Sequence, residues 1–238
     1  MKKHFTLIGS AFVAVVLLVA CKREYIVGGD VHDVNMYKNV STYDVLKKFP
    51  EYDTLVQLID AGNLQEAINQ NNSTFFAVNN RSIFAYLNAR TIFLQNTVDQ
   101  NKKFLLDSLI YYIKNNINNT RDSLLMYLVP NLQVNPDGVT QIGNIYPSAL
   151  NGSRIIVSFE ETVTANDGYY SNISTIPRLL YFTQLWKPYQ IGQDSTAAAV
   201  PPATGIRTRV KTSFINTQNG VLNALNTATL FYYGQRVN

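Results

Sequence analysis

The feature that most constrains this chain is an uncharged apolar run near its N-terminus that ends at the only cysteine. Lys2 and Lys3 precede the run, which covers residues 5–20 and leads directly into Cys21. A short basic start followed by an apolar run is the pattern of a secretory signal peptide. The run is shorter than the ~20 apolar residues that a helix needs to cross a bilayer. We therefore predict export, with residues 1–20 removed as a signal peptide.

The end of this run resembles a bacterial lipobox. Leu18-Val19-Ala20-Cys21 is similar to the site that lipoprotein signal peptidase reads. The resemblance implies cleavage before Cys21, a diacylglycerol thioether on its sulfur and usually an acylated amine. The protein would then be held on the membrane through a lipid anchor. The alternative is an ordinary signal peptide with an incidental cysteine. A single cysteine in an exported chain has no partner for an intrachain disulfide, which favours lipidation.

The rest of the chain divides into a short tether and one domain. Residues 21–40 contain charged residues and the Gly28-Gly29 break without sustained apolar periodicity, which predicts a tether. About 218 residues remain after signal removal, a length that suits one large domain or two small ones. The hydrophobic content of 46% is enough for a core, and we assign residues 41–238 to one domain.

Apolar spacing predicts helices in the first half of this domain. Ser41 and Asp44 are arranged as in a capping box. Apolar residues at i, i+3, i+4 and i+7 predict an amphipathic helix over 52–60. Gly62 then stands where a left-handed residue ends a helix, and Asn63 can cap the next one. Further helical pattern covers residues 99–128.

Strand patterns dominate the second half. The run at 74–78 predicts an early buried strand, with Asn79 or Asn80 capping a helix after it. Asn135-Pro136-Asp137-Gly138 predicts a type I turn, and Asn166-Asp167-Gly168 a hairpin tip. Helices first and strands later indicate an α+β domain. The later strands are expected at 139–146, 154–164, 178–186, 206–215 and 227–233.

Two segments resemble the paired motifs of the fasciclin-type domain. Thr74-Phe75-Phe76-Ala77-Val78-Asn79-Asn80 is similar to the family's first box, and Asn219-Gly220-Val221-Leu222-Asn223-Ala224-Leu225 to its second. The lead-in Thr42-Tyr43-Asp44-Val45-Leu46 also looks like fasciclin-type lipoproteins of the Bacteroidetes. The resemblance implies a fasciclin-like α+β fold in which N-terminal helices pack on a two-sheet β-sandwich. The length of the second half implies an insertion at about 140–205.

The sequence departs from the family pattern at several positions. Val78 stands where proline is usual, and Asn223 replaces the histidine of the second box. The family's Tyr-His pair has no counterpart, because Tyr112 and Tyr127 are followed by other residues and the only histidine after the signal peptide is His32. Sites attributed to that pair in adhesive members therefore do not carry over.

The domain carries few residues suited to catalysis. Without a histidine in the domain or a second cysteine, Ser–His and Cys–His nucleophiles and His or Cys metal sites are excluded. Glu160 and Glu161 would point to opposite faces of a strand. No Gly-rich phosphate loop is present. We predict a protein that is not an enzyme, with no catalytic residue, metal or cofactor. The formal charge of +4, without a Lys/Arg stripe, also argues against nucleic acid.

Loop aromatics are the best candidates for a binding surface. Tyr169 and Tyr170 follow the expected hairpin tip, while Trp186 and Tyr189 precede an expected loop at 190–205. Such rings stack on sugars or anchor protein partners. The alternative is that these rings cover the core.

These observations predict a cell-envelope lipoprotein whose fasciclin-like domain mediates adhesion or protein–protein interaction. The alternative is an accessory glycan-binding lipoprotein of an outer-membrane uptake system. Lys22 follows the cysteine where inner-membrane retention in enteric bacteria uses Asp, which favours the outer membrane. The sequence leaves open whether the domain faces the periplasm or the exterior.

Overall fold

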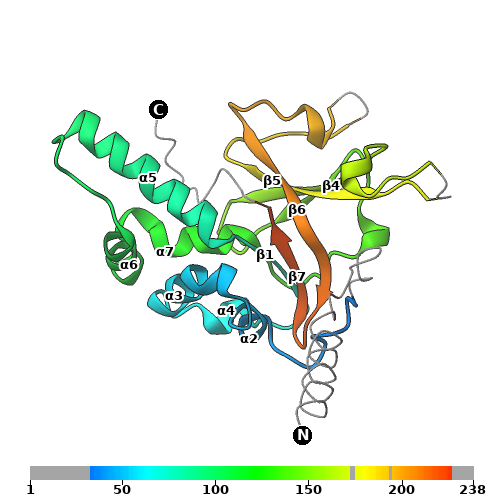
Figure 1. Ribbon diagram of the computed structural model, residues 1–238, viewed down its shortest axis with the longest axis horizontal. Helices are drawn as coiled ribbons and strands as arrows, with labels where there is room; N and C mark the ends of the chain where they lie inside the picture. The colour runs from blue at the N-terminus through cyan, green and yellow to red at the C-terminus, as the bar shows by residue number, and fades with distance from the viewer. Residues whose placement is uncertain (1–32, 172–174, 193–194, 227–238) are drawn as a thin grey trace, which may run out of the picture. The chain divides into compact units, whose positions relative to one another are not determined.

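The computed structural model describes residues 33–171, 175–192 and 195–226 (Figure 1). The chain divides into two compact units, Met1–Asp33 and Val34–Asn238. The expected signal peptide, Cys21 and the expected strand at 227–233 lie outside the described residues. Among the described residues, no helix is both long and apolar enough to span a membrane. The fold reported below is that of the second unit.

The residues just before the first helix are attached to this unit. Residues 34–40, assigned above to the tether, form turns. The backbone amide of Asn216 donates to the carbonyl of Val34 at 2.7 Å, and that of Gln218 to the carbonyl of Val40 at 2.9 Å. The folded unit therefore begins several residues before Ser41.

Most helices are short, and two of them, α2 and α5, begin at side-chain caps that the sequence predicts. The Ser41 hydroxyl accepts from the Asp44 amide at 3.1 Å, and the Asn79 side chain accepts from the Ser82 amide at 3.0 Å, so both predicted caps are confirmed. Only α5 is long, with 18 residues. The helices are α2 (Thr42–Leu46), α3 (Asp53–Ala61), α4 (Gln65–Ile68), α5 (Asn80–Thr97), α6 (Leu106–Lys114) and α7 (Thr120–Ser123).

The end of α3 differs from the prediction. Gly62 has φ −90°, and the left-handed residue is Asn63 at φ 52°. A Cβ on Gly62 would lie 3.0 Å from Cγ of Arg121, so space at this position is tight, while the backbone conformation does not require glycine. Asn63 is not a cap, because α4 is preceded by Leu64.

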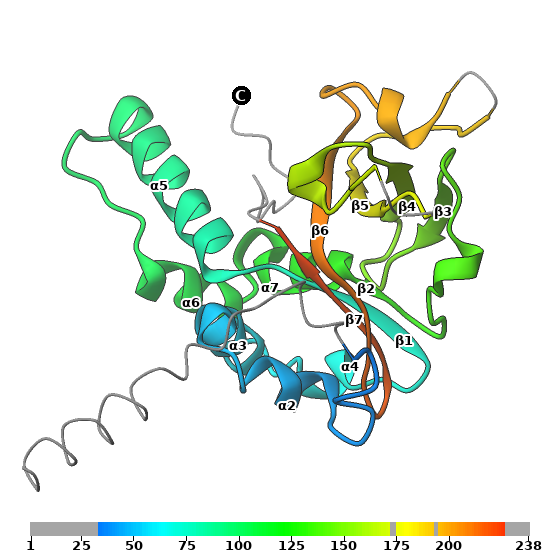
Figure 2. The ribbon, with the colours of Figure 1, turned by 45° about the vertical axis from the view of Figure 1, so that its right-hand side comes forward.

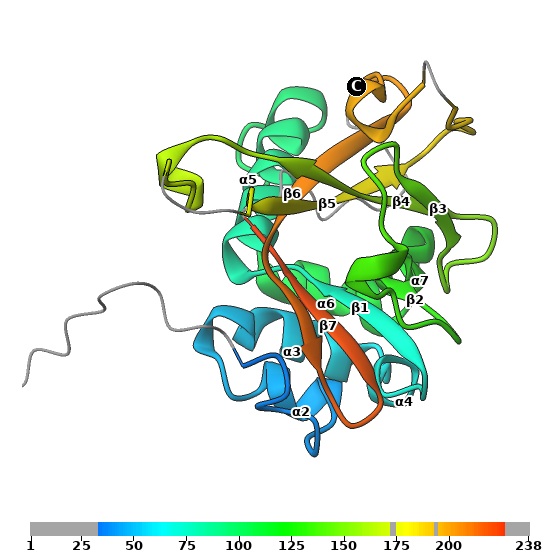
Figure 3. The same ribbon diagram turned by 90° about the vertical axis from the view of Figure 1, so that its right-hand side faces the viewer.

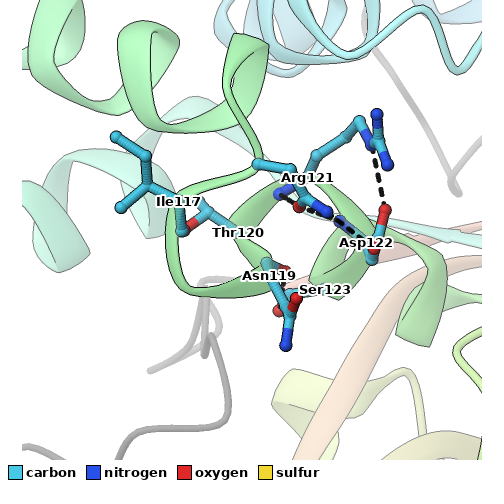
Figure 4. A network of polar contacts seen from close by, with 7 residues as sticks. Ile117, Asn119, Thr120, Arg121, Asp122 and Ser123 are labelled. Atoms are coloured by element: carbon cyan, nitrogen blue, oxygen red, sulfur yellow. Dashed lines mark hydrogen bonds and ion pairs between the residues drawn. The ribbon is translucent and has the colours of Figure 1, made fainter.

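Asparagine serves widely as the left-handed residue of this chain. Six of the seven described non-glycine residues with positive φ are asparagines, in agreement with the tolerance of Asn for this region. Three of them precede α7 at positions 116, 118 and 119. The Asn116 carbonyl oxygen Oδ1 accepts from the Arg121 amide, and its Nδ2 donates to Asp122 at 2.8 Å. Figure 4 shows the adjoining network, in which Arg121 pairs with Asp122 at 2.9 Å.

The strands form one mixed sheet of seven strands in the order β2-β1-β7-β6-β5-β4-β3. The β1–β7 pair is parallel, and every other neighbouring pair is antiparallel. The predicted early strand is confirmed as β1. The strands are β1 (Ser73–Ala77), β2 (Leu128–Val129), β3 (Asn144–Pro147), β4 (Arg154–Glu161), β5 (Arg178–Leu185), β6 (Gly205–Asn216) and β7 (Gly220–Leu225).

This sheet curls into a nearly closed, barrel-like arrangement around one core (Figure 3). The expected architecture, N-terminal helices packed on a two-sheet β-sandwich, is therefore wrong. The reason lies in β6, which has 12 residues and two register shifts against β7 and so continues from one half of the sheet into the other. Bulges of this kind bend a strand and increase its twist. Phe76 of β1 consequently meets Phe182 of β5, with ring centroids 4.8 Å apart.

The residues 140–205, predicted as an insertion, contain β3, β4 and β5 together with the segment that follows β5. They thus supply three of the seven strands and one wall of the core, to which Ile155, Val157 and Phe182 belong.

The two boxes that resemble fasciclin motifs are adjacent strands. Phe75 of the first box pairs in register with Leu222 of the second. Asn219, 6% exposed, accepts a hydrogen bond from the Thr42 amide at 2.9 Å and so fastens the lead-in segment to the same place. A Cβ on Gly220 would lie 2.1 Å from the Ser73 carbonyl oxygen. These residues are thus parts of one structural joint.

Replacing Gly220 should open this joint. The added methyl group of Gly220→Ala overlaps backbone of β1, which cannot rotate away as a flexible side chain could. We expect a loss of about 3 kcal/mol or more in the free energy of unfolding, measured by urea denaturation. Gly138→Ala is the control, because nothing lies within 4 Å of its Cβ. Equal stability of the two variants would contradict the assignment.

The Tyr43 hydroxyl should make stability depend on pH in the alkaline range. It donates to the Asp60 carboxylate at 2.6 Å, and this bond together with burial and the nearby negative charge raises the pKa of Tyr43 to about 12. Unfolded tyrosine titrates near pH ~10. Because the folded pKa is the higher one, the contribution is complete below pH ~10 and is lost as the pH rises through about 12.

We therefore expect Tyr43→Phe to flatten this part of the curve of unfolding free energy against pH. Urea titrations over that pH range measure it, with Tyr111→Phe, on a ring that is 60% exposed, as the control. If Tyr43→Phe shows the same dependence of unfolding free energy on pH as the wild type, the Tyr43–Asp60 hydrogen bond is not its cause.

Candidate functional site

A pocket of about 410 Å³ lies where β5 ends and β4 begins. Its described lining includes Trp186, Lys187, Tyr189 and Gln190 from the segment after β5, and Arg154 from the first position of β4. In Figure 2 the three strands β3, β4 and β5 lie together at the upper right, with the yellow-to-orange segment after β5 above them. The pocket is thus built on the half of the sheet that residues 140–205 supply.

The described parts of the segment 186–204 (residues 186–192 and 195–204) are fastened back onto the sheet. The amides of Trp186 and Lys187 both donate to the Thr204 carbonyl, at 3.0 and 3.2 Å. The Tyr189 hydroxyl donates to the Thr196 carbonyl at 3.3 Å. The Ala197 amide donates to the Ile142 carbonyl at 2.8 Å. Four backbone or hydroxyl donors thus hold the wall of the pocket in place.

A second, smaller apolar cluster lies under this segment. Ile156 of β4, Leu185 of β5 and Ala197 are buried together, on the side of the strands that does not face the main core. The Tyr189 ring packs against them while it also lines the pocket. Tyr189 therefore does both things that the sequence left open: it covers apolar residues, and it also lines the pocket.

The four predicted aromatics do not form one surface. Trp186 and Tyr189 line the pocket together. Tyr169 and Tyr170 follow a 3₁₀ turn, Ala165–Asp167, in the connection between β4 and β5. In the β4–β5 ladder, Glu161↔Arg178 lies next to that connection and Ile155↔Gln184 next to the pocket. At ~3.3 Å per residue these ends are about 20 Å apart. Tyr170 is 61% exposed but remote from the pocket.

Sequence reasoning missed the two cations of the pocket. Arg154 and Lys187 are exposed, and within the described part of the chain neither forms an ion pair. The described lining of the pocket contains no Asp or Glu. A charged residue at the start of a strand carries no local signal for a site, since only the fold brings Arg154 next to the segment after β5.

Most other charges on β4, β5 and β6 are neutralised within the sheet. Arg207 contacts Glu160 at 2.6 Å and stacks on the Tyr181 ring at 3.6 Å. Burial raises the pKa of Tyr181, and Glu160 raises it further. Glu161 pairs instead with Arg178 at 3.9 Å, so the adjacent carboxylates have different partners, as expected for a strand.

The adjacent glutamates of β4 have separate partners, and the described residues hold no metal-binding cluster. The carboxylates Glu160 and Glu161 are engaged by different arginines and do not converge on one point. No group of three or more His, Cys, Asp or Glu side chains among the described residues could hold a metal ion. The pocket instead combines aromatic surface, an amide and two unneutralised cations.

Comparison with protein-family models and with curated proteins finds no match for this chain. The fasciclin resemblance therefore depends on the segments quoted above and on how they lie in the fold.

The loop that forms the pocket should be displaced by a methyl group at position 143. Gly143 has φ +106°, and a Cβ there would lie 2.7 Å from Ile156 and 3.0 Å from Ala197. Gly143→Ala should cost about 1–3 kcal/mol in backbone strain alone and push Ala197 off the sheet. Trp186 is the only tryptophan of the chain, so its fluorescence emission should shift to longer wavelength.

Gly152→Ala is the matched control, because its φ of +77° imposes similar strain while nothing lies within 4 Å of its Cβ. An equal emission shift in both variants would show that contact with Ala197 is not what holds the loop.

Proposed function

We propose that this chain is a cell-envelope lipoprotein, anchored through lipid on Cys21, whose folded unit mediates adhesion or protein–protein interaction as a fasciclin-type domain. The observation that carries the proposal is the β1–β7 pair. Two segments separated by most of the chain, each resembling one box of the family's motif pair, are adjacent parallel strands in matched register. The lead-in is fastened to the same joint through Thr42 and Asn219.

The anchor and the location rest on the N-terminal sequence. Leu18-Val19-Ala20-Cys21 resembles a lipobox, and Lys22 favours the outer membrane. Two acyl chains or more would hold the protein there, since burial contributes ~0.8 kcal/mol per CH₂ and one chain binds only reversibly. Display on the cell surface and a periplasmic location are both compatible with this anchor.

A non-catalytic role agrees with the chemistry of the described residues. Arg207 and Arg178 engage the adjacent glutamates of β4. The pocket offers contacts to a ligand, and its described lining contains no Asp, Glu or His. This arrangement supports binding as the task of the unit.

The second candidate is an accessory glycan-binding lipoprotein of an outer-membrane uptake system. It is favoured by Trp186 and Tyr189, which line one pocket, because aromatic faces stack on sugar rings. It differs from the first candidate in its ligand but shares the anchor.

The first proposal is tested by metabolic labelling and cross-linking in cells that produce the full chain. Radioactive palmitate should label the wild type, and cross-linking followed by pull-down from solubilised envelopes should recover a defined protein partner. Cys21→Ser should carry no label, because its hydroxyl cannot form the thioether.

A wild-type protein without label would refute the anchor. A labelled protein that yields no partner but binds glycan would refute the first candidate and leave the second. Arg154→Gln serves as the control variant, since a protein partner held outside the pocket should be recovered equally with it.

A further inference from the structure

We propose that the pocket between β4 and the segment after β5 binds a negatively charged sugar, a uronic acid residue of an acidic glycan. Arg154 and Lys187 would hold its carboxylate while the Trp186 ring stacks on the sugar. The inference rests on the second candidate function and names the class of its ligand.

The first argument is the charge of the pocket. All six ion pairs of the described residues are formed by arginines or lysines that lie outside the pocket. Arg154 and Lys187 have no such partner among the described residues, yet both line one hollow that contains no described acid. Two uncompensated cations raise the local concentration of anions and favour an anionic ligand.

The second argument is the arrangement of the other lining groups. Trp186 and Tyr189 supply apolar faces, and the Gln190 amide offers donors and an acceptor suited to hydroxyl groups. The volume of about 410 Å³ falls in the range of ~300–1,000 Å³ that is usual for small-ligand sites. A ligand that is both ring-shaped and rich in hydroxyls matches this mixture better than an apolar acid does.

The third argument is rigidity. Trp186 and Lys187 are fixed through their amides to the Thr204 carbonyl, and Tyr189 through its hydroxyl to Thr196. A wall that is held before the ligand arrives loses less conformational entropy on binding. The loop therefore holds the backbone of Trp186 and Lys187 and the ring of Tyr189 in place.

A carboxylate is favoured over a phosphate chain or nucleic acid. The Arg guanidinium matches a carboxylate with two parallel hydrogen bonds. Recognition of a polyphosphate relies on several backbone amides at a helix N-terminus or nest, and no helix begins in the described lining of this pocket. Nucleic acid binding requires a longer row of cations than these two.

The test uses isothermal titration of the full-length protein, purified in a neutral detergent, with a galacturonic acid trisaccharide. The corresponding neutral galactose trisaccharide is titrated in parallel. We expect the acidic sugar to bind and the neutral one to bind at least about tenfold more weakly. Arg154→Gln and Lys187→Gln should each weaken binding of the acidic sugar by about tenfold, the effect of losing one charge-assisted hydrogen bond.

The single variant Lys102→Gln is the control, because it removes one exposed cation elsewhere and so changes the net charge by the same amount as each pocket variant. An equal loss of binding in this control would overturn the proposal, since attraction would then be unspecific.

Two further outcomes separate this inference from the function it rests on. Equal binding of both sugars, weakened by Trp186→Phe and unaffected at Arg154, would overturn the acidic ligand and retain glycan binding. Failure of both sugars to bind would overturn the inference, while the adhesion proposal would still be decided by the partner pull-down.

Discussion

The parallel contact between β1 and β7 is the constraint on which the rest of this fold depends. It joins residues near position 75 to residues near 222, and the close approach of Gly220 to the Ser73 carbonyl allows it. Asn219 accepts from the Thr42 amide at the start of α2 and donates to the Ile68 carbonyl at the end of α4, at 3.4 Å, so it holds both helices beside the two strands. One short segment of the second box thus sets the positions of the N-terminal helices, the first strand and the last described strand. Parallel pairing of this kind needs a long connection, and nearly the whole domain provides it.

The bend of β6 carries this arrangement to the other half of the sheet. Phe214 adopts φ 58°, and the Asn223 side chain accepts from its amide at 2.8 Å, which stabilises a conformation that a bulky residue rarely adopts. The strand then turns far enough that Phe182 reaches Phe76 across the core. β5 pairs with the part of β6 on the other side of this bend, and β4 pairs with β5. The face of β4 and β5 away from the main core carries Ile156 and Leu185, on which the segment after β5 packs. The pocket is therefore an indirect consequence of the bulge.

Local chemistry is the part of this structure that the sequence could predict. Ser41 and one of the neighbours Asn79 and Asn80 can be predicted as caps, because a side-chain oxygen before an apolar helix acts over only three residues, and the structure selects Asn79. The left-handed residue after α3 is harder to predict, since Asn63 rather than Gly62 takes that conformation, and the tight space at Gly62 comes from Arg121, far along the chain. The predicted two-sheet β-sandwich is wrong because it, too, depends on contacts between residues far apart in the chain. Whether strands close into one sheet depends on pairing partners and bulges, which no local pattern reveals.

The candidate site shows the same limit, and it also shows how charge separates structural from functional residues. Aromatic residues in loops indicated Trp186 and Tyr189, but Tyr169 and Tyr170 lie at the other end of the same strands, and Arg154 gave no signal at all. Once the fold is known, the distinction follows from pairing. Arg207 and Arg178 are occupied by carboxylates and by the aromatic rings of Tyr181 and Phe159, so they contribute to the sheet itself. A cation that the described fold does not occupy contributes little to folding, because exposed charges without a partner gain nothing from the native state. Such a cation can pair with an anionic ligand without breaking a contact of the described fold. In the pocket, Arg154 and Lys187 are two such cations, and they lie beside aromatic side chains.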